Sequence, residues 1–185
     1  LILLNFTNFL LLGNFPVTLL LNLKTTFVIF LNKYVKPYLD SPTFNRILPS
    51  GSQPGKLYGL SKIYKPQCPL RPVVSMLHTS EYNLAKYLDF FIKQNTPSSF
   101  MLCSTADFIS SLSNLSINPN SFLVSYDVES LFTNVPLNET INIASEYCYG
   151  PDAKVTPSFN KDTFEKLLKL ATSGIFSFSG NYYIQ

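Results

Sequence analysis

Several residue types that build functional sites are scarce in this 185-residue chain. It has no tryptophan, a single histidine at His78, and three widely separated cysteines, Cys68, Cys103 and Cys148. Zinc sites and disulfide frameworks need clustered cysteines or histidines, so neither is indicated. Isolated cysteines fit a reducing compartment, and we expect an intracellular protein, nuclear or cytoplasmic rather than secreted.

Charge is also scarce at the start of the chain, where Lys24 is the only charged residue among the first 32. Residues 2–23 are long enough to cross a bilayer. However, asparagines recur through this stretch, Gly13 and Pro16 interrupt it, and no basic cluster precedes it. Polar amides and helix breakers are unfavourable in hydrocarbon, so a membrane partner is disfavoured. A buried helix pair, or translated noncoding sequence fused to a real domain, explains the composition better.

A run of turn-forming residues, PSGSQPG at 49–55, is the best candidate for a domain boundary. We therefore divide the chain into a hydrophobic N-terminal extension at residues 1–54 and a domain at residues 55–185. The chain starts at Leu1 rather than at methionine, and a strand-like run leads directly to Gln185, so we expect a fragment of a longer protein. A hydrophobic content of 46% is sufficient for one core of ordinary size.

Strand-like and helical patterns are mixed after residue 55, which predicts an α+β fold. The β-prone runs at 57–60 and 72–76 predict a hairpin-like pair around a proline-interrupted loop. Gly180-Asn181 separates two further β-prone runs and predicts a two-residue hairpin turn. Apolar residues spaced by three and four predict four helices, which begin near Ser80, Thr105, Pro136 and Asn160. We expect Ser80, Thr105 and Asn160 to cap three of them.

Asp127 is the first candidate for chemistry. The nearly continuous apolar run at 122–128 predicts a strand that is buried on both faces, with Asp127 at its downstream end. A carboxylate in that place is costly unless it is compensated, and a bound divalent cation is one such partner. A helix cap or a buried ion pair would also compensate it, and spacing alone favours this structural explanation.

The second candidate is a basic loop. Between residues 56 and 71 the chain has four cations and no acidic residue: Lys56, Lys62, Lys65 and Arg71. Prolines on both sides of Arg71 stiffen its surroundings, and a guanidinium held in place can bind a phosphate with two hydrogen bonds. Tyr58 and Tyr64 alternate with the lysines, and aromatic rings beside cations suit nucleic-acid strands. A solvated basic loop fits the composition equally well.

Three stretches of sequence occur in the same order as the motifs of a known protein family. They are KLYGLSKIYKP at 56–66 with PLRPVVS at 69–75, YNLAKYL at 82–88, and SYDVESLFTNVP at 125–136. Together they resemble the first fingers motifs, the following helix and the first palm motif of Penelope-like retroelement reverse transcriptases. The last stretch is highly specific, and the resemblance covers about residues 55–185. Ser61 and Tyr64 stand where this family usually has proline and histidine, and Tyr126 replaces the commoner phenylalanine.

The resemblance implies a partial right-hand polymerase fold, with fingers at 55–120 and an incomplete palm at 121–185. It implies an RNA-directed DNA polymerase that uses Mg²⁺ as cofactor for two-metal nucleotidyl transfer. The implied partners are an RNA template, a DNA primer and deoxynucleoside triphosphates. Asp127 matches the first metal-binding aspartate, and the backbone carbonyl of Val128 would be a weaker metal contact.

The resemblance also implies roles in nucleotide binding. Arg71, with Lys62 or Lys65, would hold the triphosphate. Phe132 matches a bulky ring that excludes a 2′-hydroxyl, although a plain core phenylalanine is the alternative. The paired aspartates of the second palm motif would lie beyond Gln185, and one carboxylate cannot hold two magnesium ions. We therefore expect this chain alone to lack polymerase activity; the alternative function is a nucleic-acid-binding remnant that never polymerises.

Overall fold

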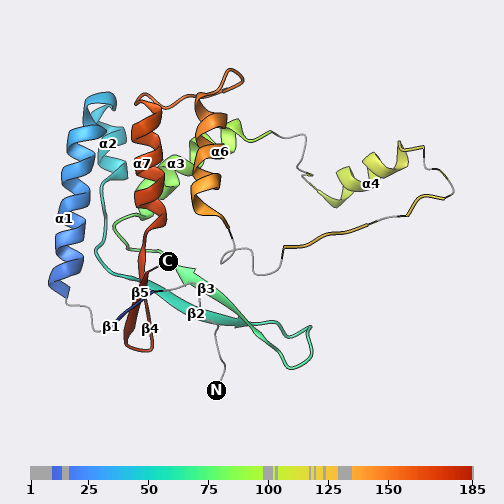
Figure 1. Ribbon diagram of the computed structural model, residues 1–185, viewed down its shortest axis with the longest axis horizontal. Coiled ribbons are helices and arrows are strands. Elements are labelled where there is room, and N and C mark those ends of the chain that lie inside the picture. The colour runs from blue at the N-terminus through green and yellow to red at the C-terminus, as the bar shows by residue number, and fades with distance from the viewer. Residues whose placement is uncertain are drawn as a thin grey trace.

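The computed structural model describes residues 10–13, 17–97, 102, 104–116, 118, 120–122, 124–128 and 135–184. Figure 1 shows a layer of helices above a five-stranded sheet, which agrees with the predicted α+β class. The described helices are α1 (Val17–Tyr34), the 3-10 helix η1 (Lys36–Tyr38), α2 (Ser41–Ile47), α3 (Tyr82–Asn95), α4 (Thr105–Ser113), α6 (Leu137–Tyr149) and α7 (Lys161–Thr172). The strands are β1 (Leu10–Gly13), β2 (Gly55–Ser61), β3 (Leu70–Ser75), β4 (Ile175–Phe178) and β5 (Asn181–Ile184).

The strands are arranged in the order β1-β5-β4-β2-β3. Strands β2 and β3 form the predicted antiparallel hairpin, and β2 pairs in parallel with β4. Strands β4 and β5 form a second hairpin. Its two-residue loop is Ser179-Gly180, one residue earlier than predicted, and both loop residues have positive φ, at 47° and 82°. Two consecutive positive φ values are typical of the turns that match the twist of a tight hairpin.

The helices α1, α2, α3, α6 and α7 bury one hydrophobic core. Leu84 of α3, Ile141 of α6 and Phe164 of α7 belong to it, which confirms the predicted apolar faces of these three helices. Asn160 caps α7 as predicted, because its side chain accepts a hydrogen bond from the Thr163 N–H at 2.8 Å. The other two predicted caps were wrong by one position, since α3 is preceded by Glu81 and α4 by Ser104.

The first 54 residues contribute to the same core. The core that α3, α6 and α7 share also contains Phe27 and Leu31 of α1, Val35 directly after it, and Phe44 and Ile47 of α2. Strand β1 pairs with β5 at one edge of the sheet. Among the described helices, none combines the length and the apolar character needed to cross a membrane.

The predicted buried strand at 122–128 was wrong. Its described residues form no strand, and Phe122 and Tyr126 are 85% and 93% exposed. An apolar run shows that a segment can be buried, but a strand also needs a neighbour to pair its backbone groups, and no described strand pairs with this one. Figure 1 shows the segment leading back from α4, which stands apart from the other helices. Helix α4 forms as predicted, yet Ile109 and Leu115 of its apolar stripe are also exposed.

Candidate nucleic-acid interface

The β2–β3 hairpin carries the predicted basic loop, and its register decides which side chains share a face. Leu60 is paired with Arg71, Tyr58 with Val73, and Lys56 with Ser75. Directly paired residues of an antiparallel ladder project to the same side of the sheet. Lys56, Tyr58 and Arg71 therefore lie on one face of the hairpin, and all three are exposed. Figure 1 shows the hairpin projecting away from the helices.

The opposite face holds the hairpin to the protein. Leu57 is buried there, and the base of β2 is fixed by its pairing with β4 and by the Ser177 hydroxyl, which donates to the Gly55 carbonyl at 3.2 Å. Gly59 lies under Leu70, because a Cβ at position 59 would come within 2.6 Å of the leucine Cδ1. The opposite face is therefore packed at the base of the hairpin, at Leu57, whereas Gly59, Ser61 and Pro72 farther along it are exposed.

The connection between the two strands is a series of tight backbone turns. The Lys62 N–H donates to the Pro69 carbonyl at 2.9 Å, and the Lys65 N–H donates to the Lys62 carbonyl at 3.0 Å. Lys62 and Lys65 thus begin and end one turn. Lys65 is exposed and Lys62 is half-buried, while Tyr64 between them is 70% exposed. The tip therefore offers two cations and an aromatic ring close together along the chain.

Among the described residues, no carboxylate forms an ion pair with the hairpin cations. The ion pairs among the described residues join Lys93 to Asp89 at 2.6 Å, Lys166 to Asp162 at 2.7 Å, and Lys161 to Glu146, all on or beside helices. None of these pairs involves Lys56, Lys62, Lys65 or Arg71. An unpaired cation remains available to an external anion, and phosphate is the anion that arginine and lysine bind most commonly in nucleic acids.

The other predicted site residues lie elsewhere. Asp127 and Val128 belong to the exposed segment at 124–128, and no described hydrogen bond or ion pair joins Asp127 to a hairpin cation. In the part of the chain that the structure describes, no three histidine, cysteine, aspartate or glutamate residues gather into a metal-binding group. Phe132 lies outside the described residues.

Two exposed apolar residues on the hairpin were missed from the sequence. Leu60 is 52% exposed and shares the face of Tyr58 and Arg71, and Ile63 at the tip is 83% exposed. The period-two pattern of a strand already places residues 56, 58 and 60 on one side, so that pattern would have identified Leu60.

Comparison with known proteins gives no relative, since no family model, curated protein or solved structure matches the chain.

Proposed function

We propose that this chain is part of a Penelope-like reverse transcriptase and that the β2–β3 hairpin is its nucleotide- and nucleic-acid-binding element. One observation carries the proposal: Lys56, Lys62, Lys65 and Arg71 are gathered on a projecting hairpin without ion-pair partners among the described residues. Tyr58 and Tyr64 add exposed rings beside these cations. Such a surface suits the phosphates and bases of a primer, a template or a deoxynucleoside triphosphate.

The proposal assigns roles to this chain's own residues. Arg71 is planar and always charged, so it binds a phosphate with two parallel hydrogen bonds, while Lys62 and Lys65 add mobile point charges at the tip. The right-hand polymerase fold, with fingers at 55–120 and palm at 121–185, belongs to the same proposal, as does the place of Phe132 beside the sugar. This part of the proposal is supported by the three stretches of sequence that resemble Penelope-like reverse transcriptases.

The described residues do not by themselves fit a two-metal site. Asp127 offers one carboxylate and Val128 one carbonyl oxygen, and both are hard ligands that suit Mg²⁺. Two bridged ions need further carboxylates, and no group of three acidic, histidine or cysteine residues lies in the described chain. We therefore propose Asp127 and Val128 only as part of the metal site of a whole enzyme, and we assign binding rather than catalysis to the chain alone.

A non-catalytic nucleic-acid-binding module is the second candidate. It is favoured by the completeness of the hairpin surface, which needs neither Asp127 nor a metal ion to bind a phosphate backbone. The two candidates share the hairpin and differ in whether Asp127 has a role.

The first experiment tests the hairpin. Affinity for a fluorescent RNA–DNA primer-template would be measured by anisotropy over a range of salt concentrations, for the full chain and two triple variants. The hairpin variant replaces Lys62, Lys65 and Arg71 with glutamine. The control replaces three exposed helix and loop lysines, Lys86, Lys154 and Lys169, and so lowers the net charge equally.

We expect the hairpin variant to bind about tenfold to a hundredfold more weakly at low salt. The slope of its log affinity against log salt concentration should become shallower by about two to three, because about two to three fewer counterions are released. The control should keep most of its affinity. Equal losses in the two variants would contradict a binding site on the hairpin, because they would reflect net charge alone.

Asp127→Asn separates the two candidates. If the chain belongs to a polymerase, Mg²⁺ should strengthen the binding of a deoxynucleoside triphosphate to the wild-type chain, and the substitution should remove that increase while leaving primer-template affinity unchanged. If the chain is only a binding module, Mg²⁺ should not strengthen triphosphate binding, and the substitution should have no effect on it.

A further inference from the structure

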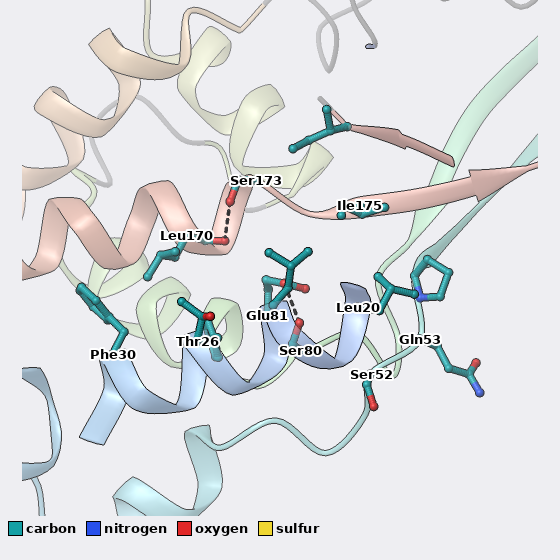
Figure 2. Close-up of a pocket in the computed structure, with 14 residues that line it drawn as sticks. Leu20, Thr26, Phe30, Ser52, Gln53, Ser80, Glu81, Leu170, Ser173 and Ile175 are labelled. Atoms are coloured by element: carbon teal, nitrogen blue, oxygen red, sulfur yellow. Dashed lines mark hydrogen bonds between the residues drawn. The ribbon is translucent and has the colours of Figure 1, made fainter. Parts of the chain in front are cut away.

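A cavity of about 260 Å³ lies between α1, the end of α7, strands β4 and β5, and the loops at 52–54 and 80–81. Most of its lining is apolar and includes Leu20, Leu23, Phe27, Phe30, Leu170 and Ile175. Figure 2 shows Thr26 and Phe30 rising from α1 on one side and Ile175 on β4 on the other, with Ser80 and Glu81 between them. An engineered apolar cavity of about 150 Å³ binds benzene, so this one has room for a ring and a short chain.

The polar side of the cavity accepts hydrogen bonds. The Ser80 hydroxyl donates to the Glu81 carboxylate at 2.6 Å, and the Ser173 hydroxyl donates to the Leu170 carbonyl at 3.2 Å. Each hydroxyl hydrogen is already used, which leaves the oxygen lone pairs as acceptors, and an ionised carboxylate accepts only. Gln53 also lines the cavity, but its side chain points away from the other residues in Figure 2. Its lining, within the part of the chain that the structure describes, includes no lysine or arginine.

We propose that this cavity is a binding site for a small primary amine with an apolar body, whose ammonium group lies against Glu81. An ammonium supplies three donors and a positive charge, which matches the Glu81 carboxylate and the acceptor oxygen of the adjacent Ser80 hydroxyl. A carboxylate ligand would meet Glu81 as a like charge, and an alcohol would gain only a neutral hydrogen bond. No residue from Lys56 to Arg71 lines the cavity, so this site is separate from the basic hairpin.

Three probes of one shape test the proposal: phenethylamine, 2-phenylethanol and 3-phenylpropionate. Each is titrated against the full chain by saturation-transfer NMR. We expect phenethylamine to bind with a Kd of about 1 mM, as befits a ligand of so few atoms. The alcohol should bind about tenfold more weakly, and the carboxylate should show no binding. Equal binding of all three probes, or no binding of the amine, would overturn the proposal.

Two leucines on α1 give a matched pair of variants. Leu23 lines the cavity and Leu21 does not, and they are similarly exposed, at 44% and 49%. Leu23→Trp should fill the space and weaken amine binding at least about tenfold, whereas Leu21→Trp should leave it unchanged. Equal effects of the two substitutions would place the amine elsewhere on the protein.

Glu81→Gln tests the charge separately from the shape. Glu81 precedes α3 but its side chain makes no capping hydrogen bond, so the substitution spares the start of the helix. The amine and the alcohol should then bind with the same affinity. A variant that still prefers the amine would show that Glu81 does not hold the ammonium group.

Discussion

A single buried amide holds a long loop to the helical core. The Asn95 side chain donates to the carbonyls of Phe91 and Val155 at 2.9 and 2.7 Å, and its Nδ2 lies 3.6 Å from the Cys148 Sγ. Its oxygen accepts from the N–H groups of Lys154 and Val155 at 2.7 and 3.1 Å. Backbone groups of the loop after α6 are therefore satisfied by a residue about sixty positions earlier in the sequence.

Asn95→Ala should destabilise the protein by about 3 kcal/mol, because it leaves buried backbone donors and an acceptor without partners. The free energy of unfolding would be measured by urea denaturation followed by circular dichroism. Gln94→Ala is the matched control, since Gln94 is exposed on the same helix. A loss below about 1 kcal/mol for Asn95→Ala would mean that water replaces the amide in the folded state.

One buried thiol, Cys148, and two half-buried tyrosines, Tyr87 and Tyr149, should make the protein sensitive to alkali. Burial raises the pKa of Tyr149 strongly, with a smaller contribution from the nearby Cys148, and burial also raises the pKa of Cys148 and of Tyr87. The folded state thus favours the protonated forms. Their stabilising contribution is complete below the ordinary pKa values of 9.0 for cysteine and 10.0 for tyrosine, and is lost as pH rises above them.

Tyr149→Phe should reduce this alkaline sensitivity. The substitution removes a hydroxyl that donates to the Phe159 carbonyl at 2.7 Å, so it should cost about 1 kcal/mol at neutral pH. Above pH 10.0, the urea midpoint should then fall less steeply than in the wild-type chain. Tyr58→Phe, at an exposed tyrosine, should change neither quantity. Parallel pH curves for Tyr149→Phe and the wild-type chain would contradict the assignment.

At the scale of elements, the free edge of β3 is protected by a proline. The hydrogen bond from the Lys62 N–H to the Pro69 carbonyl fixes which pairs of the hairpin ladder exchange bonds. In an antiparallel ladder, hydrogen-bonded pairs alternate with pairs that are not hydrogen-bonded. Counting from the hydrogen-bonded pair Lys62–Pro69, the pair Gly59–Pro72 is not hydrogen-bonded, so the Pro72 nitrogen faces away from β2. A proline there removes a donor from the outer edge and hinders pairing with another chain.

Pro72→Val should therefore promote self-association through β3. Light scattering coupled to size-exclusion chromatography would detect dimers or larger species at concentrations where the wild-type chain has the lower mass. Pro66→Val is the control, because Pro66 lies in the hairpin tip and outside both strands. Identical masses for the Pro72 variant and the wild-type chain would show that the twist of the hairpin alone protects the edge.

Local patterns predicted those elements whose signals lie within a few residues. The apolar spacing and the cap of α7, and the β-prone runs of β2 and β3, depend on neighbours in sequence, so they were predicted correctly. The segment at 122–128 depends on a pairing partner, which its own residues do not specify. The same reasoning explains why one site was predicted and the other was not. The hairpin cations lie within sixteen consecutive residues, from Lys56 to Arg71. The cavity joins segments from Leu20 to Ile184, and no local sequence pattern connects them.

At the scale of the whole molecule, the structure joins the N-terminal 54 residues to the rest through shared burial. Leu31 is fully buried in α1 and belongs to the same core as Leu84, Leu88 and Phe164. If this core is one cooperative unit, damage to α1 must be transmitted to α3 and α7. A separate extension would instead lose α1 and leave the other helices protected.

Leu31→Ala decides between these outcomes. Removing a fully buried leucine side chain should cost about 3 kcal/mol, and in one cooperative unit the amides of α3 and α7 should exchange with deuterium faster by a common factor. Leu21→Ala, at a half-exposed position on the same helix, should leave exchange nearly unchanged. Faster exchange confined to α1 would make residues 1–54 an appendage and the boundary near residue 54 a true one. Faster exchange throughout the helices would mean that α1 and α7, which are far apart in sequence, belong to one cooperative core.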